Sequence, residues 1–485
     1  MRSSRTGMRP SRSHDTLAKC AMKHLIVITA VSAALSLSAC VTVGPDYNQP
    51  ELPMPASYDE APSADSIQGA WWTLFGEPTL DSLVVEALAG NQDLAIAAAR
   101  VEEARALAGI ARADQWPEVN ATADVARTRQ SDMFLPPVGE AENNFFSGAG
   151  TLSFELDFWG RLRRTTEAAR AELLATEEAQ RIVALALVSE VALAYFDLVA
   201  LDLQLAIAQE TLSSRSEAVV LQVSRLDAGT ISELDLTQAR ADLAAAEAAT
   251  PVLERLVRQT EDRMAVLLGR IGGTVERGAS LDVVGAPEVP VGLPSELLTR
   301  RPDVLAAEQA LVAANARIGA ARAAYFPSVA LTGYAGYESE ALSDLVTPGA
   351  GIWQAAVSVF QPIFNAGRTR RQVDAARARE RQALAAYTKT VQVAFAEVED
   401  ALVARRTSVA EREALMRRVE TLTLARSLAQ VRYEAGESSY LDVLDADRNL
   451  FQAELDLTDV RRSELAAAVT LFKALGGGWT DDTLL

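Results

Sequence analysis

Residues 151–164 read TLSFELDFWGRLRR, and they decide the fold because the spacing of apolar residues changes within them. The first eight positions alternate polar and apolar residues, which is typical of a β-strand with one polar and one apolar face. From Arg161 to Leu226 the chain contains neither Pro nor Gly. Such a run predicts one helix of roughly 100 Å at about 1.5 Å per residue. The sequence therefore predicts a strand that leads directly into a very long helix.

The same order of elements recurs in the second half of the chain. Gly160 and Gly367 are 207 positions apart, and each is followed by an Arg-rich start of a long helix. Pro117 and Pro327, which each end a helical stretch before a strand, are 210 positions apart. We therefore expect one repeat over residues 79–290 and a second over 291–475, followed by a tail at 476–485. Arg301, in the sequence RRP, is expected to form a structural corner.

Four segments alternate with a period of two, and they lie at residues 119–125, 151–158, 328–333 and 353–359. A polar loop that includes Pro136-Pro137 and Asn143-Asn144 is expected between the first two. Each strand can extend to about 10 residues, the length of a tilted membrane strand. A half-buried sheet of a soluble protein shows the same alternation. Aromatic residues near the strand ends favour the membrane, where such rings gather at the interfaces.

Two helical hairpins are expected. A second long helix covers 368–435, and shorter partners cover 233–269 and 440–475. Gly229 and Gly436 provide left-handed C-caps at the turns, and Ser232 and Ser439 can cap the helices that follow. A soluble all-helical bundle is the simpler alternative, but it leaves the four strands without a role. The predicted fold class is mainly α with a membrane β portion.

The N-terminal residues resemble an export signal. Residues 25–37 form an apolar run of about 13 residues, too short to span a bilayer, and Leu37-Ser38-Ala39-Cys40 resembles a bacterial lipobox. We expect residues 1–39 to be a signal peptide, with 1–21 a misassigned start. Cys40 is then diacylated and palmitoylated at the head of an extended segment, residues 40–78. An ordinary signal peptide is the alternative, and Val41 favours the outer membrane.

Composition removes several classes of function. The formal charge of −19 argues against nucleic acid, which requires a basic surface. The two cysteines are Cys20 and Cys40, and the two histidines, His14 and His24, both precede the expected cleavage point. We therefore expect no disulfide, metal site, cofactor or catalytic residue, and we do not expect an enzyme.

Helical membrane spans are also expected to be absent. The most apolar stretch, residues 182–208, is interrupted by Glu190, Asp197 and Asp202. Any crossing of a membrane would then be made by strands. Four strands cannot close a barrel, so membrane strands force the chain to assemble, and three copies supply twelve strands around an aqueous lumen.

Several motifs together resemble those of the outer-membrane factor lipoproteins of resistance-nodulation-division efflux systems, the TolC-like channels of the NodT type. These are Cys40; Val43-Gly44-Pro45-Asp46-Tyr47; Trp71-Trp72; Asn91 with Asp93-Leu94; residues 297–304, LLTRRPDV; and residues 433–436, YEAG, with 441–445, LDVLD. The resemblance implies a homotrimer whose twelve-stranded barrel continues as a periplasmic helical barrel. It also implies a periplasmic adaptor and an inner-membrane pump as partners, and passive export of drugs or toxic small molecules.

The resemblance further implies a gate at the hairpin tips. Asp442 and Asp445 are three residues apart and lie on nearly the same helix face. In a trimer they would form acidic rings, and Tyr433 would contact Asp235 on the neighbouring hairpin. Ser438 departs from relatives that carry Arg at this position. The alternative is that both Asp442 and Asp445 only stabilise the helix N-terminus.

Adaptor docking is assigned to the same tips. The candidates are Arg225, Leu226, Gly229, Thr230 and Gly436, together with Tyr433. The glycines and Leu226 could instead serve only the turns. Two alternatives to an efflux channel stay open at this point: a TolC-like duct for type I protein secretion, and a periplasmic coiled-coil lipoprotein scaffold without a pore.

Overall fold

The computed structural model describes residues 42–53, 55, 58, 69–129, 131, 133, 142–290 and 296–477. The predicted signal peptide, Cys40, Pro136-Pro137 and most of the C-terminal tail lie outside these residues. The elements, in chain order, are η1 (Trp71–Phe75), α2 (Pro78–Gly90), α3 (Gln92–Ala113), β1 (Glu118–Arg129), β2 (Glu142–Leu156), α4 (Arg161–Asp227), α5 (Glu233–Leu267), α6 (Leu297–Arg300), α7 (Pro302–Ala323), β3 (Ser328–Ser339), η3 (Leu342–Asp344), β4 (Gly351–Phe360), α8 (Arg368–Glu434) and α9 (Tyr440–Ala474).

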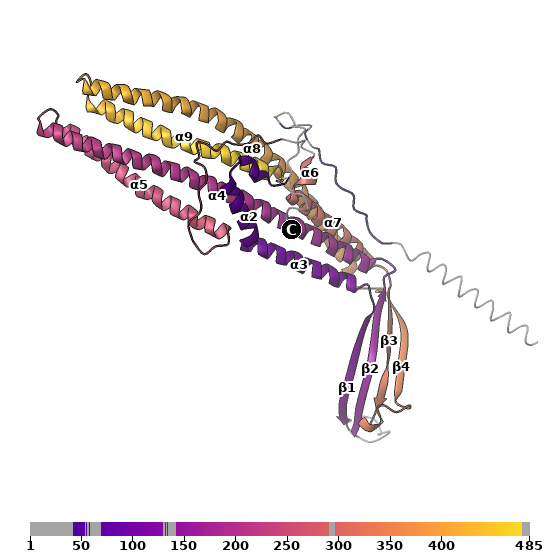
Figure 1. Ribbon diagram of the computed structural model, residues 1–485. Coiled ribbons are helices and arrows are strands. Elements are labelled where there is room, and N and C mark those ends of the chain that lie inside the picture. The colour runs from indigo at the N-terminus through magenta and orange to yellow at the C-terminus, as the bar shows by residue number, and fades with distance from the viewer. Residues whose placement is uncertain are drawn as a thin grey trace, which may run out of the picture. The chain divides into compact units, whose positions relative to one another are not determined.

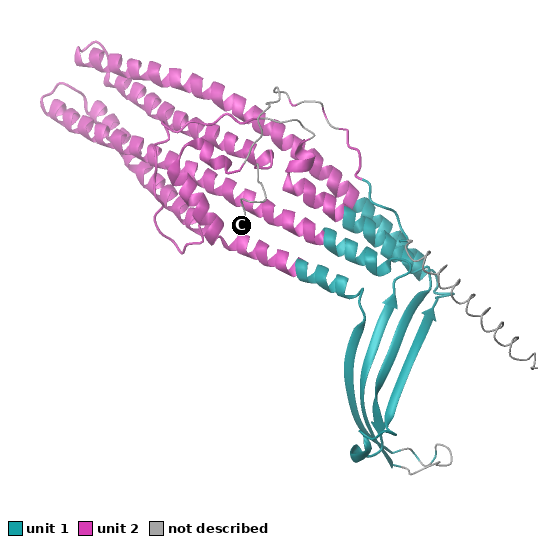
Figure 2. Cartoon of the chain, turned by 45° about the vertical axis from the view of Figure 1, so that its right-hand side comes forward, with its two compact units in different colours: residues 1–48, 105–171, 312–382 teal, residues 49–104, 172–311, 383–485 magenta. Residues whose placement is uncertain are grey.

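The chain divides into two compact units, which Figure 2 colours separately. Unit 1 contains residues 1–48, 105–171 and 312–382, and therefore holds the strands and the helix ends next to them. Unit 2 contains residues 49–104, 172–311 and 383–485, and holds most of the helices. Each unit draws on both sequence repeats, so neither repeat is a compact body by itself.

Unit 1 contains a four-stranded antiparallel sheet in the order β1-β2-β3-β4 (Figure 1). The register pairs Glu118 with Ser153, Leu156 with Val329, and Ser328 with Phe360. All four predicted strands are present. The prediction that Asn143-Asn144 lie in a loop is wrong, because both residues pair with β1 inside β2. Pairing across the hairpin outweighs the low strand propensity of Asn.

The sheet has two open edges. In the part of the sheet that the structure describes, β1 and β4 each pair on one side only. Large apolar side chains on these edge strands are exposed, with Val125 at 76% and Trp353 at 79% of their surface accessible. Isolated chains of water-soluble proteins rarely leave such strands open and apolar.

The helices form two hairpins of equal dimensions. The long helices α4 and α8 have 67 residues each, and the shorter α5 and α9 have 35 each. All four differ from the predicted bounds by two residues or fewer, because a glycine shortly beyond the C-terminus of each helix sets a clear end. Pro251 lies inside α5.

One stretch of α4 has the length and composition of a membrane-spanning helix, contrary to the prediction from sequence. α4 contains a window of 18 residues that is long and apolar enough by composition to cross a membrane, with a mean hydropathy of 2.1. The prediction that composition excludes every helical span was therefore wrong. In the structure, 67% of that window is buried, so packing accounts for its apolar character.

Unit 2 has an aromatic core. Trp71 of η1 is fully buried and stacks on Phe472 of α9 with ring centroids 5.1 Å apart, while Phe75 lies 5.0 Å from Phe196 of α4. Such ring pairs add stability beyond their buried area. They fix the extended N-terminal region on both hairpins of this unit.

The two repeats anchor their hairpins by equivalent positions. Asn91 caps α3 and donates to the carbonyl of Leu267 at the end of α5, at 2.9 Å. Arg301, which precedes α7, donates to the carbonyl of Ala474 at the end of α9, also at 2.9 Å. Arg301 is buried and forms an ion pair with Asp303 at 2.6 Å. These contacts agree with the interpretation of Arg301 as a structural corner.

Candidate functional site

The candidate site is the pair of hairpin tips in unit 2, which point the same way in Figure 1. At the first tip α4 ends and Gly229 adopts a φ of 70°. Its N–H donates to the carbonyl of Leu226, and the N–H and hydroxyl of Thr230 both donate to the carbonyl of Arg225. These bonds satisfy carbonyls that the helix end leaves free. The predicted capping role of Gly229 is confirmed.

The second tip has the same backbone but a different cap. Gly436 has a φ of 76°, and the N–H of Glu437 donates to the carbonyl of Arg432 at 2.8 Å. Ser232 forms a complete capping box at the start of α5, whereas the side chain of Ser439 makes no capping hydrogen bond to α9. The prediction that Ser232 caps its helix is confirmed, and the prediction that the side chain of Ser439 caps α9 is wrong.

An aromatic cluster joins the two tips. Tyr433 of α8 and Tyr440 of α9 have ring centroids 5.2 Å apart, and the guanidinium of Arg225 lies 4.9 Å from the centroid of the Tyr433 ring. The hydroxyl of Tyr433 donates to the side-chain oxygen of Gln222 at 3.2 Å. Arg225 and Gln222 belong to α4, so these contacts connect the two hairpins.

Asp235 has a different partner from the predicted one. Its carboxylate accepts from the backbone N–H of Ser232 at 3.0 Å and from the Ser232 hydroxyl at 2.8 Å. Within this chain the acceptor for Tyr433 is Gln222. In this chain, therefore, Tyr433 bonds to Gln222 and the carboxylate of Asp235 bonds to Ser232.

The predicted gate acids are exposed. Asp442 lies in the first turn of α9, and Asp445 follows one turn later and accepts from Asn449 at 3.1 Å. Neither carboxylate has a cationic partner among the ion pairs of the described residues. Their charges are thus available to solvent or to another copy of the chain, and their role as a gate stays a prediction.

A buried ion cluster deeper in the hairpins was missed by the sequence analysis. Asp242 of α5 is 3% exposed and lies 2.9 Å from Arg215 of α4 and 2.7 Å from Arg448 of α9. Its partners are 27 and 206 positions away in the chain. No local pattern could reveal them, although a charged residue at an apolar-periodic position of α5 was a possible signal.

Throughout the residues that the structure describes, no group of three or more His, Cys, Asp or Glu side chains is arranged to hold a metal ion.

Comparison with known proteins gives consistent matches over most of the chain. A family model described as outer membrane efflux protein matches residues 83–270 and again 293–477. The solvent efflux pump outer membrane protein SrpC of Pseudomonas putida is 39% identical over 460 residues, which cover 92% of this chain and 97% of that protein. The probable outer membrane lipoprotein SilC of Salmonella typhimurium is 34% identical, covering 94% of this chain and 99% of that one. The solved outer membrane channel CmeC of Campylobacter jejuni superposes with a TM-score of 0.85 at 27% identity, covering 90% and 95% of the two chains.

Proposed function

This chain belongs to the outer membrane efflux protein family, and on that premise we propose that it is the outer-membrane channel subunit of a tripartite efflux pump. It conducts small molecules passively from the periplasmic parts of the pump to the outside. The fold is TolC-like, mainly helical with one four-stranded antiparallel sheet. Among the relatives named above, SrpC is an efflux pump outer membrane protein and CmeC is an outer membrane channel. No catalytic step belongs to the proposal.

The observation that carries the proposal is the combination of an open sheet with two long helical hairpins. Four strands leave β1 and β4 unpaired on their outer sides within the described sheet. An open edge cannot remain in lipid, so the sheet needs further copies to close it. Three copies give a barrel of twelve strands, which is wide enough for an aqueous lumen. The hairpins of the same copies would surround the continuation of that lumen in the periplasm.

The gate is proposed at the hairpin tips. Exposed Asp442 and Asp445 would form rings of carboxylates when three copies surround one axis, and such rings favour cations. The contacts of Tyr433 with Gln222 and Arg225 support a closed arrangement, because they join the two hairpins next to these acids. A contact of Tyr433 with Asp235 on a neighbouring hairpin of another copy would further hold the closed state. Opening would then require Tyr433 to leave these partners.

Partners are proposed on the same surface. A periplasmic adaptor would dock on the tips, at Arg225, Leu226, Gly229, Thr230 and Gly436, and would connect the channel to an inner-membrane pump of the resistance-nodulation-division class. Gly229 and Gly436 also serve the turns, so substitutions there test docking poorly. Arg225 and Thr230 are the better probes.

Membrane attachment is proposed through Cys40, which lies outside the described residues. Diacylglycerol and palmitate on this residue would anchor the chain in the outer membrane, with the helices extending into the periplasm. Two or three acyl chains suffice for stable anchoring, whereas one gives reversible binding. Mass spectrometry of the mature N-terminus tests this directly, with Cys40→Ala as the variant that removes the attachment point.

The test of the proposal is single-channel conductance of the purified protein in planar bilayers. The native protein is expected to give a small, cation-selective conductance. The double variant Asp442→Ala, Asp445→Ala is expected to give a larger or less cation-selective one, since the carboxylates repel anions and narrow the opening. A pore unchanged by the double substitution would place the gate elsewhere. Folded oligomers that form no pore would overturn the channel function.

A further inference from the structure

The motif Val43-Gly44-Pro45-Asp46 is not used by the channel or its gate, yet its first three residues are half-buried. Residues 42–46 lie in unit 1 together with the corner at which β2 passes into α4, residues 157–164, and with the part of α7 from Val312 onward. The N–H of Val43 donates to the carbonyl of Trp159 at 3.1 Å. The start of the described chain is therefore bonded to the strand-to-helix corner.

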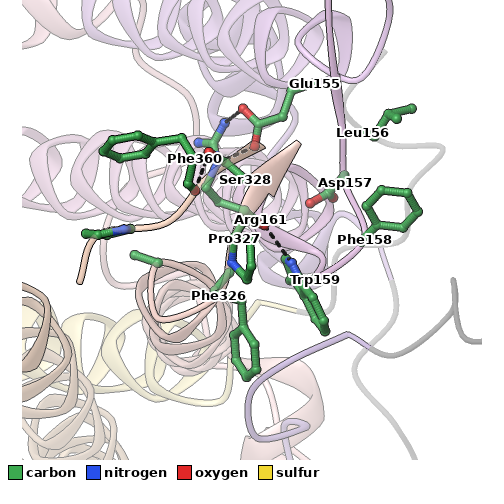
Figure 3. Close-up of a pocket in the computed structure, with 13 residues that line it drawn as sticks. Glu155, Leu156, Asp157, Phe158, Trp159, Arg161, Phe326, Pro327, Ser328 and Phe360 are labelled. Carbon is green, nitrogen blue, oxygen red and sulfur yellow. Dashed lines mark hydrogen bonds and ion pairs between the residues drawn. The ribbon is translucent and has the colours of Figure 1, made fainter. Parts of the chain in front are cut away.

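The corner itself is held by ring stacking and by hydrogen bonds. Figure 3 shows Trp159 beside Phe326 and Pro327, which precede β3. The rings of Trp159 and Phe326 stack with centroids 4.6 Å apart, and the indole N–H of Trp159 donates to the carbonyl of Pro327 at 2.8 Å. Arg161 adds two hydrogen bonds to the carboxylate of Glu155, at 2.9 and 2.6 Å. Residues from both halves of the chain thus form the surface on which residues 42–46 lie.

Close approaches at three positions leave room only for glycine. A Cβ on Gly319 of α7 would lie 2.8 Å from the carbonyl oxygen of Val43, and a Cβ on Gly44 would lie 2.5 Å from the Cα of Gly319. Gly160, with a φ of 77°, faces the methyl group of Thr42 in the same way. The equivalent of Gly319 in the first repeat is Gly109 of α3, and a Cβ there would meet nothing within 4 Å. A Cβ on Gly319 would also lie 2.9 Å from the side chain of Arg164, so the close packing at Gly319 has no equivalent in the first repeat.

An ion pair holds the far end of the segment. The guanidinium of Arg164 is buried, with 6% of its side chain exposed, and lies 2.7 Å from Asp46 and 2.9 Å from Glu167. Asp46 is 90% exposed, so its own packing contributes little. A buried guanidinium needs carboxylate partners, and loss of one leaves its charge poorly compensated. Asp46 therefore acts as the partner that residues 42–46 bring to Arg164.

We propose that residues 42–46 form a clip that docks on the β2–α4 corner and α7, and that this clip fixes where the lipid anchor leaves the folded protein. Cys40 is two residues before Thr42, so its Cα lies within about 7 Å of the docked Thr42. The lipid anchor would then leave the protein next to the docked clip. The statement about lipid rests on the proposed acylation of Cys40, whereas the docking of the clip does not.

The experiment measures how often the clip leaves its site. In the full-length protein, Thr42→Cys provides a thiol that packs against Gly160 when the clip is docked, and Cys40 is the other cysteine after the expected cleavage point. Its rate of reaction with a maleimide is measured in native outer membranes. We expect Asp46→Ala to raise the rate about tenfold, the effect of losing a hydrogen bond to a buried charge. We expect Gly319→Ala to raise it at least as much.

Two controls match these variants. Glu51→Ala removes another acid shortly after the clip, and Gly109→Ala adds the same methyl group at the equivalent position of α3, and neither is expected to change the rate. Equal rates in Asp46→Ala, Gly319→Ala and the two controls would overturn the proposal. If Gly319→Ala does not fold, Asp46→Ala still decides, because the exposed Asp46 side chain can be removed without opening a cavity.

The mass of the labelled chain reports acylation of Cys40 separately. If the clip is docked but the chain carries no acyl group, the proposed lipid anchor is contradicted and the proposed clip is not. If Cys40 is acylated but the thiol of the Thr42→Cys protein, without a second substitution, reacts as fast as an exposed thiol, the clip is contradicted and the lipid anchor is not.

Discussion

At the scale of single residues, Arg225 and Tyr433 offer the sharpest test of how the tips stay together. A guanidinium over an aromatic ring at a half-exposed site contributes about 0.5–1 kcal/mol, and Arg225 lies over the ring of Tyr433. We predict that Arg225→Ala shifts the balance between open and closed pores by about two- to fivefold toward open. Open probability in planar bilayers measures this shift.

Arg432 provides the matched control for that prediction. It is exposed in the last turn of α8, at the same pair of tips, and its side chain makes no ring contact among the described residues. Arg432→Ala removes the same charge and is expected to leave the open probability unchanged. Equal effects of the two substitutions would mean that net charge at the tips, and not the contact with Tyr433, controls the pore.

Asp242 is expected to matter for stability more than any gate acid. It is buried between Arg215 and Arg448, and Arg215 also donates to its backbone carbonyl at 3.0 Å. Removal of one partner from a buried ion pair costs about 3–5 kcal/mol, because the remaining charge stays buried. We predict that Asp242→Ala lowers the temperature at which the helices unfold, followed by circular dichroism at 222 nm.

Asp456 is the control for Asp242, since it forms an ion pair with Arg418 in which both side chains are at least one third exposed. Exposed pairs contribute about 0–1 kcal/mol, so Asp456→Ala should barely change the unfolding temperature. A similar small effect of Asp242→Ala would show that solvent reaches the cluster.

At the scale of elements, the helices were the most predictable part of the fold. The start of α4 at Arg161 and the ends of α5 and α9 follow from the glycines that lie next to these ends. The start of β2 at Glu142 could not be read in the same way, because Asn143 and Asn144 join the strand only through their partners in β1. Local signals decide helix ends, while strand ends depend on residues far away in the chain.

At the candidate site, contacts between distant residues were likewise harder to predict than contacts between near neighbours in the sequence. The caps at Gly229 and Ser232 depend on neighbours within five residues, and the sequence predicted them. The contact of Tyr433 with Gln222 spans 211 positions. Resemblance had suggested Asp235 instead, and only the packing of α4 against α8 could identify Gln222.

The pairing of β2 with β3, which joins the two sequence repeats in the sheet, gives a prediction about a strand. A Cβ on Gly336 of β3 would lie 2.2 Å from the carbonyl oxygen of Gly148 in β2, whereas a Cβ on Gly148 would meet nothing within 4 Å. We predict that Gly336→Ala separates β2 from β3 and strongly reduces the yield of heat-modifiable protein on gels. Gly148→Ala should leave the yield unchanged. Equal yields would mean that the strands shift to accept the methyl group.

At the scale of the whole molecule, the sequence could predict that one chain is incomplete, because four alternating segments are too few for a closed barrel. The sheet supports that argument, since exposed apolar side chains such as Val125 and Trp353 lie on the edge strands β1 and β4. The structure of a single chain does not show how many copies assemble. The number must be inferred from the size of the barrel that the copies can close.

The number of copies is therefore the last prediction. Two copies would supply eight strands, whose interior is filled by side chains, while three supply twelve and leave a lumen. We predict that native mass spectrometry of the detergent-purified protein gives three chain masses, and that heating returns single chains. A stable monomer would contradict the need to cover β1 and β4, and a dimer would contradict the aqueous lumen. Only a trimer that also conducts ions is consistent with both the open sheet and the proposed channel.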